Sequence, residues 1–238
     1  MVTWWLGTFE GWDFMLLGDT KRALDIFNGL LLKAEGPEGN IGRVIQARFN
    51  IAWALQLAGD AAAAEPILEH SLALIRRRLD IEYFDIRYDI GELGRAKLAL
   101  GKLHEALALL DESMSNRMEV TGRREAFFPG DAMLDVARGE ALLRLRRDSE
   151  AREQFERVVN FWRDFDPEHP MAAEAAWWYG HSLIATGEVK RGKAMVAEAR
   201  PRLAASFLPH LRPLATAPAP IPLAARSTPG PKAQTAAR

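Results

Sequence analysis

The sequence predicts an all-α protein, a right-handed α-solenoid of about five antiparallel helix pairs with a disordered C-terminal tail. Three observations lead to this prediction. Apolar residues recur with a helical period, they do not alternate with the period of two that strands need, and one pattern of small residues occurs five times along the chain. A helix pair of this kind leaves an apolar face exposed, and stacking on the next pair buries it.

The repeated pattern consists of a short turn with a small residue on either side. The small residues after the turns lie 41, 42, 45 and 41 positions apart, and they are Ala23, Ala64, Ala106, Ala151 and Gly192. The small residues before the turns each precede the turn by seven positions, and they are Gly11, Ala52, Gly94, Gly139 and Gly180. Two antiparallel helices approach closely only where side chains are nearly absent, so these positions predict the contacts within each pair.

The spacing places the solenoid at residues 1–210, in units at about 3–40, 41–82, 83–128, 129–170 and 171–210. In the first unit, helices are expected over about 3–17 and 21–33. The second unit has a long second helix from residue 61, and Pro66 is expected to bend it or fray its start. The third unit ends in the longest connector, MEVTGRREAFFPGD, which accounts for the offset of 45. The segment DPEHP separates the fourth pair from the fifth.

The end of the chain differs in composition from the rest. Residues 211–238 are rich in Pro and Ala, carry four basic residues and no acidic one, and have too little apolar surface to fold, so a disordered tail is expected. The apolar piece LAASFLPHLRPL, residues 203–214, overlaps the start of this tail and is expected to cap the stack. Four charges over this length are too sparse for a nucleic-acid footprint.

The units resemble the tetratricopeptide repeat. The third unit carries the resemblance best, through Leu93, Gly94, Gly101, Ala106 and Leu110. The lengthened second helix, the fragment GDAAAAEPILEHSLAL and the segment PEHP resemble the kinesin light chain type of this repeat. The resemblance spans roughly residues 11–203, and a HEAT-like stack, which has a similar period, is the alternative.

The resemblance implies an extended concave groove lined by the first helix of each pair. Positions one after and three before the first small residue of each unit are expected to face it. These positions are Trp12 and Thr8, Trp53 and Phe49, Arg95 and Gly91, Glu140 and Val136, and His181 and Trp177, with Asn50 and Trp178 at its shoulder. In the resembled family, an Asn at the place of Asn50 commonly hydrogen-bonds the backbone of an extended peptide. Packing in the core is the competing explanation for the tryptophans.

No chemistry is expected. The five histidines lack metal-ligand spacing, no Gly-rich phosphate loop or serine elbow occurs, and the chain has no cysteine. We therefore predict no catalytic, cofactor-binding or metal-binding residue. With 31 basic and 32 acidic residues, the chain has no charge excess that calls for a nucleic acid or a membrane.

The sequence thus predicts a cytoplasmic protein–protein interaction module that binds an extended peptide or a helix of a protein partner. Two other functions stay open. The chain could be a sensor or regulatory segment of a larger signalling protein, such as a bacterial Ser/Thr kinase or an ATP-dependent transcription regulator. It could also be a self-associating scaffold, a homo-oligomer formed through an uncapped N-terminal face on which Trp4 and Trp5 are apolar.

Overall fold

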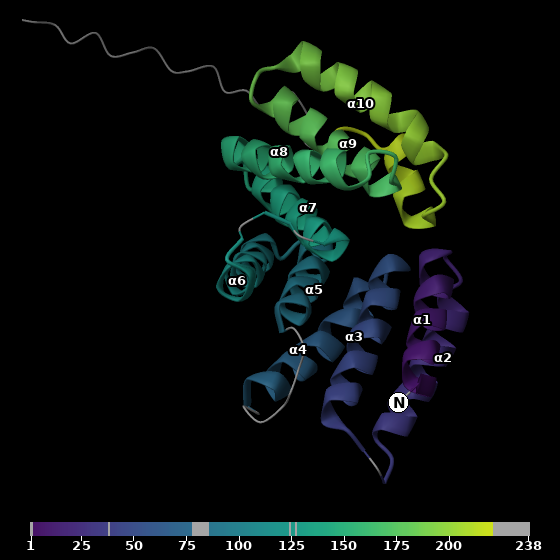
Figure 1. Ribbon diagram of the computed structural model, residues 1–238. Helices are drawn as coiled ribbons and strands as arrows, with labels where there is room; N and C mark the ends of the chain where they lie inside the picture. The colour runs from purple at the N-terminus through teal and green to yellow at the C-terminus, as the bar shows by residue number, and fades with distance from the viewer. Residues whose placement is uncertain (1, 38, 78–85, 124, 127, 221–238) are drawn as a thin grey trace, which may run out of the picture.

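The computed structural model describes residues 2–37, 39–77, 86–123, 125–126 and 128–220. Within these residues the chain forms ten α-helices and one 3-10 helix, η1, and the predicted all-α solenoid is confirmed (Figure 1). The elements are α1 (Val2–Leu16), α2 (Thr20–Ala34), α3 (Ile41–Leu57), α4 (Ala61–Arg77), α5 (Ile86–Ala99), α6 (Leu103–Thr121), α7 (Pro129–Arg144), α8 (Asp148–Phe165), α9 (Pro170–Ala185), α10 (Val189–Ala204) and η1 (Pro209–Ala215).

All five helix pairs are closed by the same turn. In the first turn the Gly18 N–H donates to the carbonyl of Met15 (3.1 Å), and the Asp19 N–H donates to that of Phe14 (2.8 Å), which is the Schellman pattern. It recurs at the four later turns, and it needs a left-handed residue at its centre. Four turns supply glycine with φ between +76° and +103°, and the fourth turn supplies Arg146 with φ of +62°.

Within a pair, a small residue on the first helix receives a bulky side chain from the second. A Cβ added at Gly11 would lie 2.3 Å from the ring of Phe27, and one added at Gly139 would lie 2.5 Å from that of Phe155. In the fifth pair the backbones themselves meet, because a Cβ at Gly192 would lie 2.4 Å from the carbonyl oxygen of Gly180. Glycine at residue 192 therefore brings α9 and α10 closer together.

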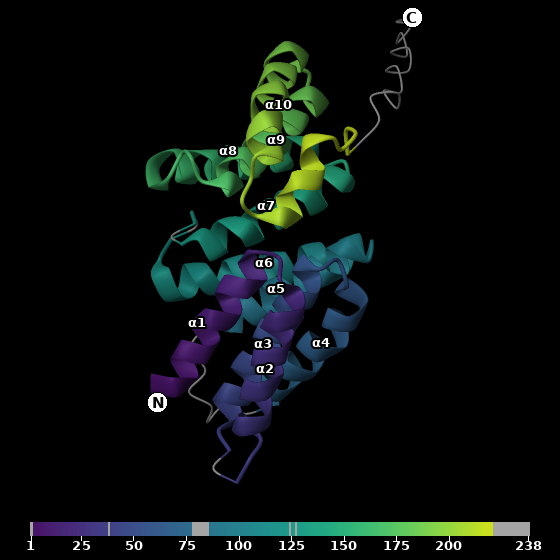
Figure 2. The same ribbon diagram turned by 90° about the vertical axis from the view of Figure 1, so that its right-hand side faces the viewer.

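The stack curves until its end returns to its beginning (Figures 1 and 2). The ring of Pro209, at the start of η1, lies 2.9 Å from the point where a Cβ of Gly18 would stand. Leu16, at the end of α1, packs against the core cluster of the C-terminal pairs. The two ends of the solenoid are thus in direct contact.

The packed structure continues past residue 210, where the tail was expected to start. Leu211 is buried within η1, and the guanidinium of Arg200 donates to the carbonyls of Ala215 (3.1 Å) and Ala217 (3.0 Å). The apolar and hydrogen-bonding contacts made by this short piece fix it on α10. Residues 221–238, the rest of the predicted tail, lie outside the described residues.

The left-handed Arg146 gives a stability prediction. A residue with a Cβ costs about 1–2 kcal/mol in this conformation, and glycine avoids most of that cost. Arg146→Gly should therefore raise the free energy of unfolding by about 1 kcal/mol relative to Arg146→Ala, as measured by urea denaturation. Both variants lose the exposed ion pair to Asp148 (2.9 Å). The difference between their free energies of unfolding therefore measures the backbone cost of the left-handed conformation alone. Equal stability of the two variants would contradict this account of the turn.

Candidate functional site

A hollow of about 470 Å³ opens on the inner face of the solenoid. Its walls come from α1, α3, α5 and α7, which are the first helices of four consecutive pairs. We call it the aromatic hollow, because its lining includes five large rings, those of Trp5, Trp12, Phe49, Trp53 and Tyr88. Three of the residues selected from the sequence, Trp12, Phe49 and Trp53, are among them, and Asn50 lines the same hollow.

The rings form a continuous row from the surface of α1 to α3. Centroid distances are 6.2 Å between Trp5 and Phe9 and 5.5 Å between Phe9 and Trp12. The row continues over 6.4 Å from Trp12 to Trp53, and over 6.1 Å from Trp53 to Phe49. Trp5 keeps 45% of its surface exposed at the outer end of the row. A ligand can therefore bury apolar groups against one preformed surface.

Asn50 is the polar residue at the base of this row, and only 1% of its surface is exposed. Its Oδ1 accepts a hydrogen bond from Nε1 of Trp12 (2.9 Å). Because an indole can only donate, this bond fixes the orientation of the amide and leaves Nδ2 as a donor. Among the described residues, neither Asn50 Nδ2 nor Trp53 Nε1 has a hydrogen-bond partner, and both atoms are buried. Two residues that line the aromatic hollow thus each carry a buried donor that lacks an acceptor.

A second hollow of about 220 Å³ adjoins the first, and Met133 on α7 lines both. We call it the charged hollow. Two residues selected from the sequence, Arg95 and Glu140, line it, together with Glu174 of α9 and His210 of η1. The C-terminal segment therefore supplies part of its wall.

The ionisable groups of the charged hollow are unevenly paired. Nη1 of Arg95 contacts both carboxylate oxygens of Glu92 (2.8 and 3.0 Å), and Arg144 pairs with Glu140 (3.3 Å). For Glu174, no hydrogen bond or ion pair occurs within the described part of the chain. Burial raises the pKa of Glu174 to about 7, Arg95 opposes that rise and Glu140 adds to it.

Burial also changes the pKa of two other groups there. It raises the pKa of Glu140 against the opposing influence of Arg144. It lowers the pKa of His210 to about 4, and the positive charge of Arg95 lowers it further. His210 is therefore neutral near pH 7 and adds no positive charge to the hollow.

The remaining selected residues, Trp177, Trp178 and His181, line neither of these two hollows. Trp178 stacks on Phe155 with a centroid distance of 5.9 Å, and the rings of Trp177 and His181 are 4.3 Å apart. All three side chains are buried, and both tryptophans belong to the C-terminal core. Burial lowers the pKa of His181 to about 4, with a further contribution from Arg200.

The prediction from the sequence missed one further position on the first helix of each pair, which also faces the hollows. The residues six before the first small residue of each unit all line one of the two hollows, and they are Trp5, Gln46, Tyr88, Met133 and Glu174. This position lies about one helical turn from the position three before the small residue, on the same face. Extending the stripe by one turn would have identified all five.

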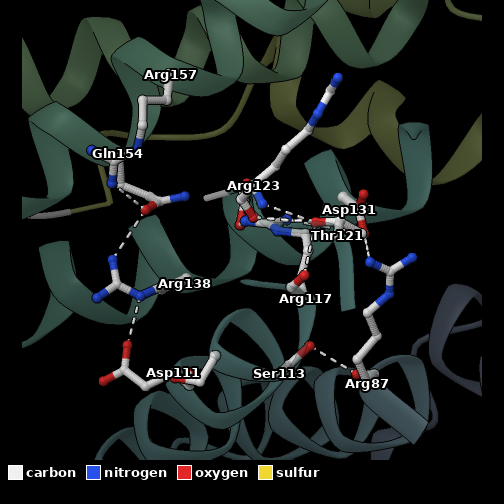
Figure 3. Close-up of polar contacts among 12 residues, drawn as sticks. Arg87, Asp111, Ser113, Arg117, Thr121, Arg123, Asp131, Arg138, Gln154 and Arg157 are labelled. Atoms are coloured by element: carbon white, nitrogen blue, oxygen red, sulfur yellow. Dashed lines mark hydrogen bonds and ion pairs between the residues drawn. The ribbon is translucent and has the colours of Figure 1, made fainter. Parts of the chain in front are cut away.

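A cluster of buried charged groups joins α6 to α7 and α8 (Figure 3). Nη2 of Arg117 contacts both carboxylate oxygens of Asp135 (2.9 and 3.1 Å). Arg138 bridges Asp111 (2.6 Å) and Gln154 (3.0 Å). The hollow beside Arg117 and Asp135 measures about 10 Å³, room for about one water molecule. This cluster therefore fixes neighbouring pairs to each other and leaves no space for a ligand.

The described residues contain no group of three or more histidine, aspartate or glutamate side chains that could hold a metal ion. Among the same residues, none of the helices combines the length and the apolar character needed to cross a membrane.

Residues 44–82, which include most of α3 and all of α4 as described, match the family model described as tetratricopeptide repeat. This segment thus carries a tetratricopeptide repeat, and the described residues as a whole have the fold of a TPR-like solenoid. Among curated proteins, none matches it by sequence.

Two solved structures share this architecture. One is a putative kinesin light chain of Podosopora anserina with nearly identical TPR-like repeats, at 19% identity and a TM-score of 0.59, covering 84% of this chain and 93% of that one. The other is BtubC (BKLC) from P. vanneervenii, at 18% identity and a TM-score of 0.62, covering 79% and 74%. These values establish the fold, and they confirm the predicted likeness to kinesin light chain repeats at that level.

The two indoles around Asn50 differ in a way that can be measured. Trp12→Phe removes the donor to Asn50 and leaves a buried oxygen without a partner, which costs about 1–3 kcal/mol. Trp53→Phe instead removes a buried donor that has no partner. We expect Trp12→Phe to lower the free energy of unfolding by at least about 1 kcal/mol more than Trp53→Phe, measured with urea. The opposite order would contradict the assigned hydrogen bond.

Proposed function

We propose that this tetratricopeptide repeat solenoid is a protein–protein interaction module whose aromatic hollow binds an extended segment of a partner protein. The observation that carries the proposal is the pair of buried donors without an acceptor, Asn50 Nδ2 and Trp53 Nε1, on two residues that line an apolar hollow. Unpaired buried donors cost stability, and a carbonyl oxygen is the acceptor that would satisfy them. A peptide offers such a carbonyl at every residue.

The walls of the hollow suit the side chains of the same ligand. Five rings from α1, α3 and α5 surround it, and Trp5 extends the apolar surface outwards. Aromatic residues dominate binding energy where they are preformed and desolvated. An extended segment can place one apolar side chain among the rings while its backbone approaches Asn50.

Peptide selection tests this function. A displayed library of random peptides would be selected on the protein, and the enriched sequences synthesised with a fluorescent label. Fluorescence anisotropy should then show that Trp53→Ala weakens binding by about 30-fold, because a central aromatic contributes 2 kcal/mol or more. Asn50→Ala should weaken it by about 3- to 10-fold through loss of a donor.

The matched control is Phe165→Ala, which removes a ring that is 56% exposed on α8 and does not line the aromatic hollow. It should leave the affinity unchanged. Peptides that bind the wild type, Trp53→Ala and Asn50→Ala with equal affinity would place recognition elsewhere and reject the proposal.

Self-association through α1 is a second candidate, and it rests on exposed apolar side chains. Leu6 is 61% exposed on α1, and Leu17, which directly follows the helix, is 65% exposed. An apolar surface of this kind is typical of a protein interface. Leu6→Glu should convert a dimer to a monomer in sedimentation velocity, whereas Leu32→Glu on α2, also at an exposed leucine, should not. A wild-type monomer at the highest soluble concentration would exclude this function.

A further inference from the structure

The two hollows form one continuous path for an elongated ligand. Met133 lines both of them. On α3, Trp53 lines the aromatic hollow and Gln56 lines the charged hollow. On α5, Glu92 lines the aromatic hollow and Arg95 lines the charged hollow. Three residues along a helix correspond to about 4.5 Å. A peptide seated among the rings therefore reaches the charged hollow within about two to four residues, at about 3.3 Å per extended residue.

The pairing in the charged hollow leaves one carboxyl group in excess. Two carboxyl groups, those of Glu140 and Glu174, and one guanidinium group, that of Arg95, line this hollow. Glu92 and Arg144 lie outside its lining as the partners of Arg95 and Glu140. Arg95 is held by both oxygens of Glu92, and Arg144 is held by Glu140 and by the carbonyl of Leu98.

Glu174 is the group left over. It lines the hollow and is only partly exposed, and the described residues provide it with neither an ion pair nor a hydrogen bond. His210 supplies no positive charge near pH 7, since burial keeps it neutral. In its ionised form, Glu174 therefore has no ion-pair partner among the described residues.

We propose that the charged hollow seats a lysine or arginine side chain of the same peptide, with Glu174 as its counter-ion. This inference rests on the proposed function, because the aromatic hollow holds the rest of the peptide. The long apolar stem of such a side chain can pack against Met133, Val136 and Leu98, which line the same hollow as Glu174. An acidic side chain would instead meet Glu140 and Glu174, while both arginines are already engaged.

The ionisation of Glu174 adds a pH dependence with a defined sign. With a pKa of about 7 in the free protein, Glu174 is mostly protonated at about pH 6 and mostly ionised at about pH 8. Binding of a cation requires the ionised form, so the affinity for a basic peptide should rise about tenfold over this interval. Glu140, whose pKa burial also raises, acts in the same direction, while Arg95 stays charged and His210 stays neutral over this interval.

The experiment uses the full chain and a set of short labelled peptides selected for binding to it. In each peptide, lysine, norleucine or glutamate is placed in turn at every position around the apolar anchor, and affinity is measured by fluorescence anisotropy. We expect one position at which lysine binds about 10-fold better than norleucine, as for a charge-assisted hydrogen bond. Glu174→Gln should abolish that preference and flatten the rise in affinity with pH.

Glu174→Gln keeps the shape of the side chain and removes a carboxyl group whose charge is costly to bury, so the variant should be at least as stable as the wild type at about pH 8. The matched control is Glu10→Gln on α1, a glutamate that is exposed and lines neither hollow. It should keep the full lysine preference.

The outcomes separate this inference from the proposed function. Peptides that bind, depend on Trp53 and Asn50, and show no lysine preference would overturn the basic subsite alone. A lysine preference that survives in Glu174→Gln would overturn it as well. Absence of binding by every peptide, or binding that ignores Trp53 and Asn50, would reject the proposed function and this inference together.

Discussion

The whole solenoid depends on one steric constraint, the close approach of the two helices in each pair. A small residue on the first helix leaves room for a bulky residue from the second, as Gly11 does for Phe27 and Gly139 for Phe155. A shared Schellman turn sets the direction of the return helix. Since the same contact and the same turn recur in every pair, each first helix presents the same face to the interior. The groove is a consequence of that packing.

The repeated geometry carries different chemistry along the groove. The first two pairs place rings at the inward positions, as at Trp12 and Trp53, and the next two place charges there, at Arg95 and Glu140. In the fifth pair the inward residues are covered, because η1 packs on α9 and Leu211 belongs to the same core as Trp177. Equivalent positions on the first helices thus line an apolar hollow in the first two pairs, line a charged hollow in the next two, and belong to the core in the fifth.

The sequence could predict the fold because small residues and turns reveal helix contacts directly, even where Arg146 replaces glycine. It could also place Asn50 beside Trp53, because both follow from the register of one helix. It could not reveal that Trp177 is covered, since that depends on how the chain folds back after α10. Nor could it place His210 in the same hollow as Arg95, because the two residues are far apart in the chain.

The link between the two hollows is itself a hydrogen-bonded network. The Nε2 group of Gln56 donates to Glu92 (2.9 Å), and the same carboxylate holds Arg95. Glu92 lies two residues before the first small residue of the third unit, as Asn50 does in the second unit. The same position therefore carries an unpaired donor in the second pair and the ion-pair partner of Arg95 in the third. Because Glu92 is nearly buried, its pairing with Arg95 is held in a low-dielectric environment and resists exchange with a ligand. Arg95 is thereby already engaged, and Glu174 is the carboxyl group lining the charged hollow for which the described residues provide no ion pair.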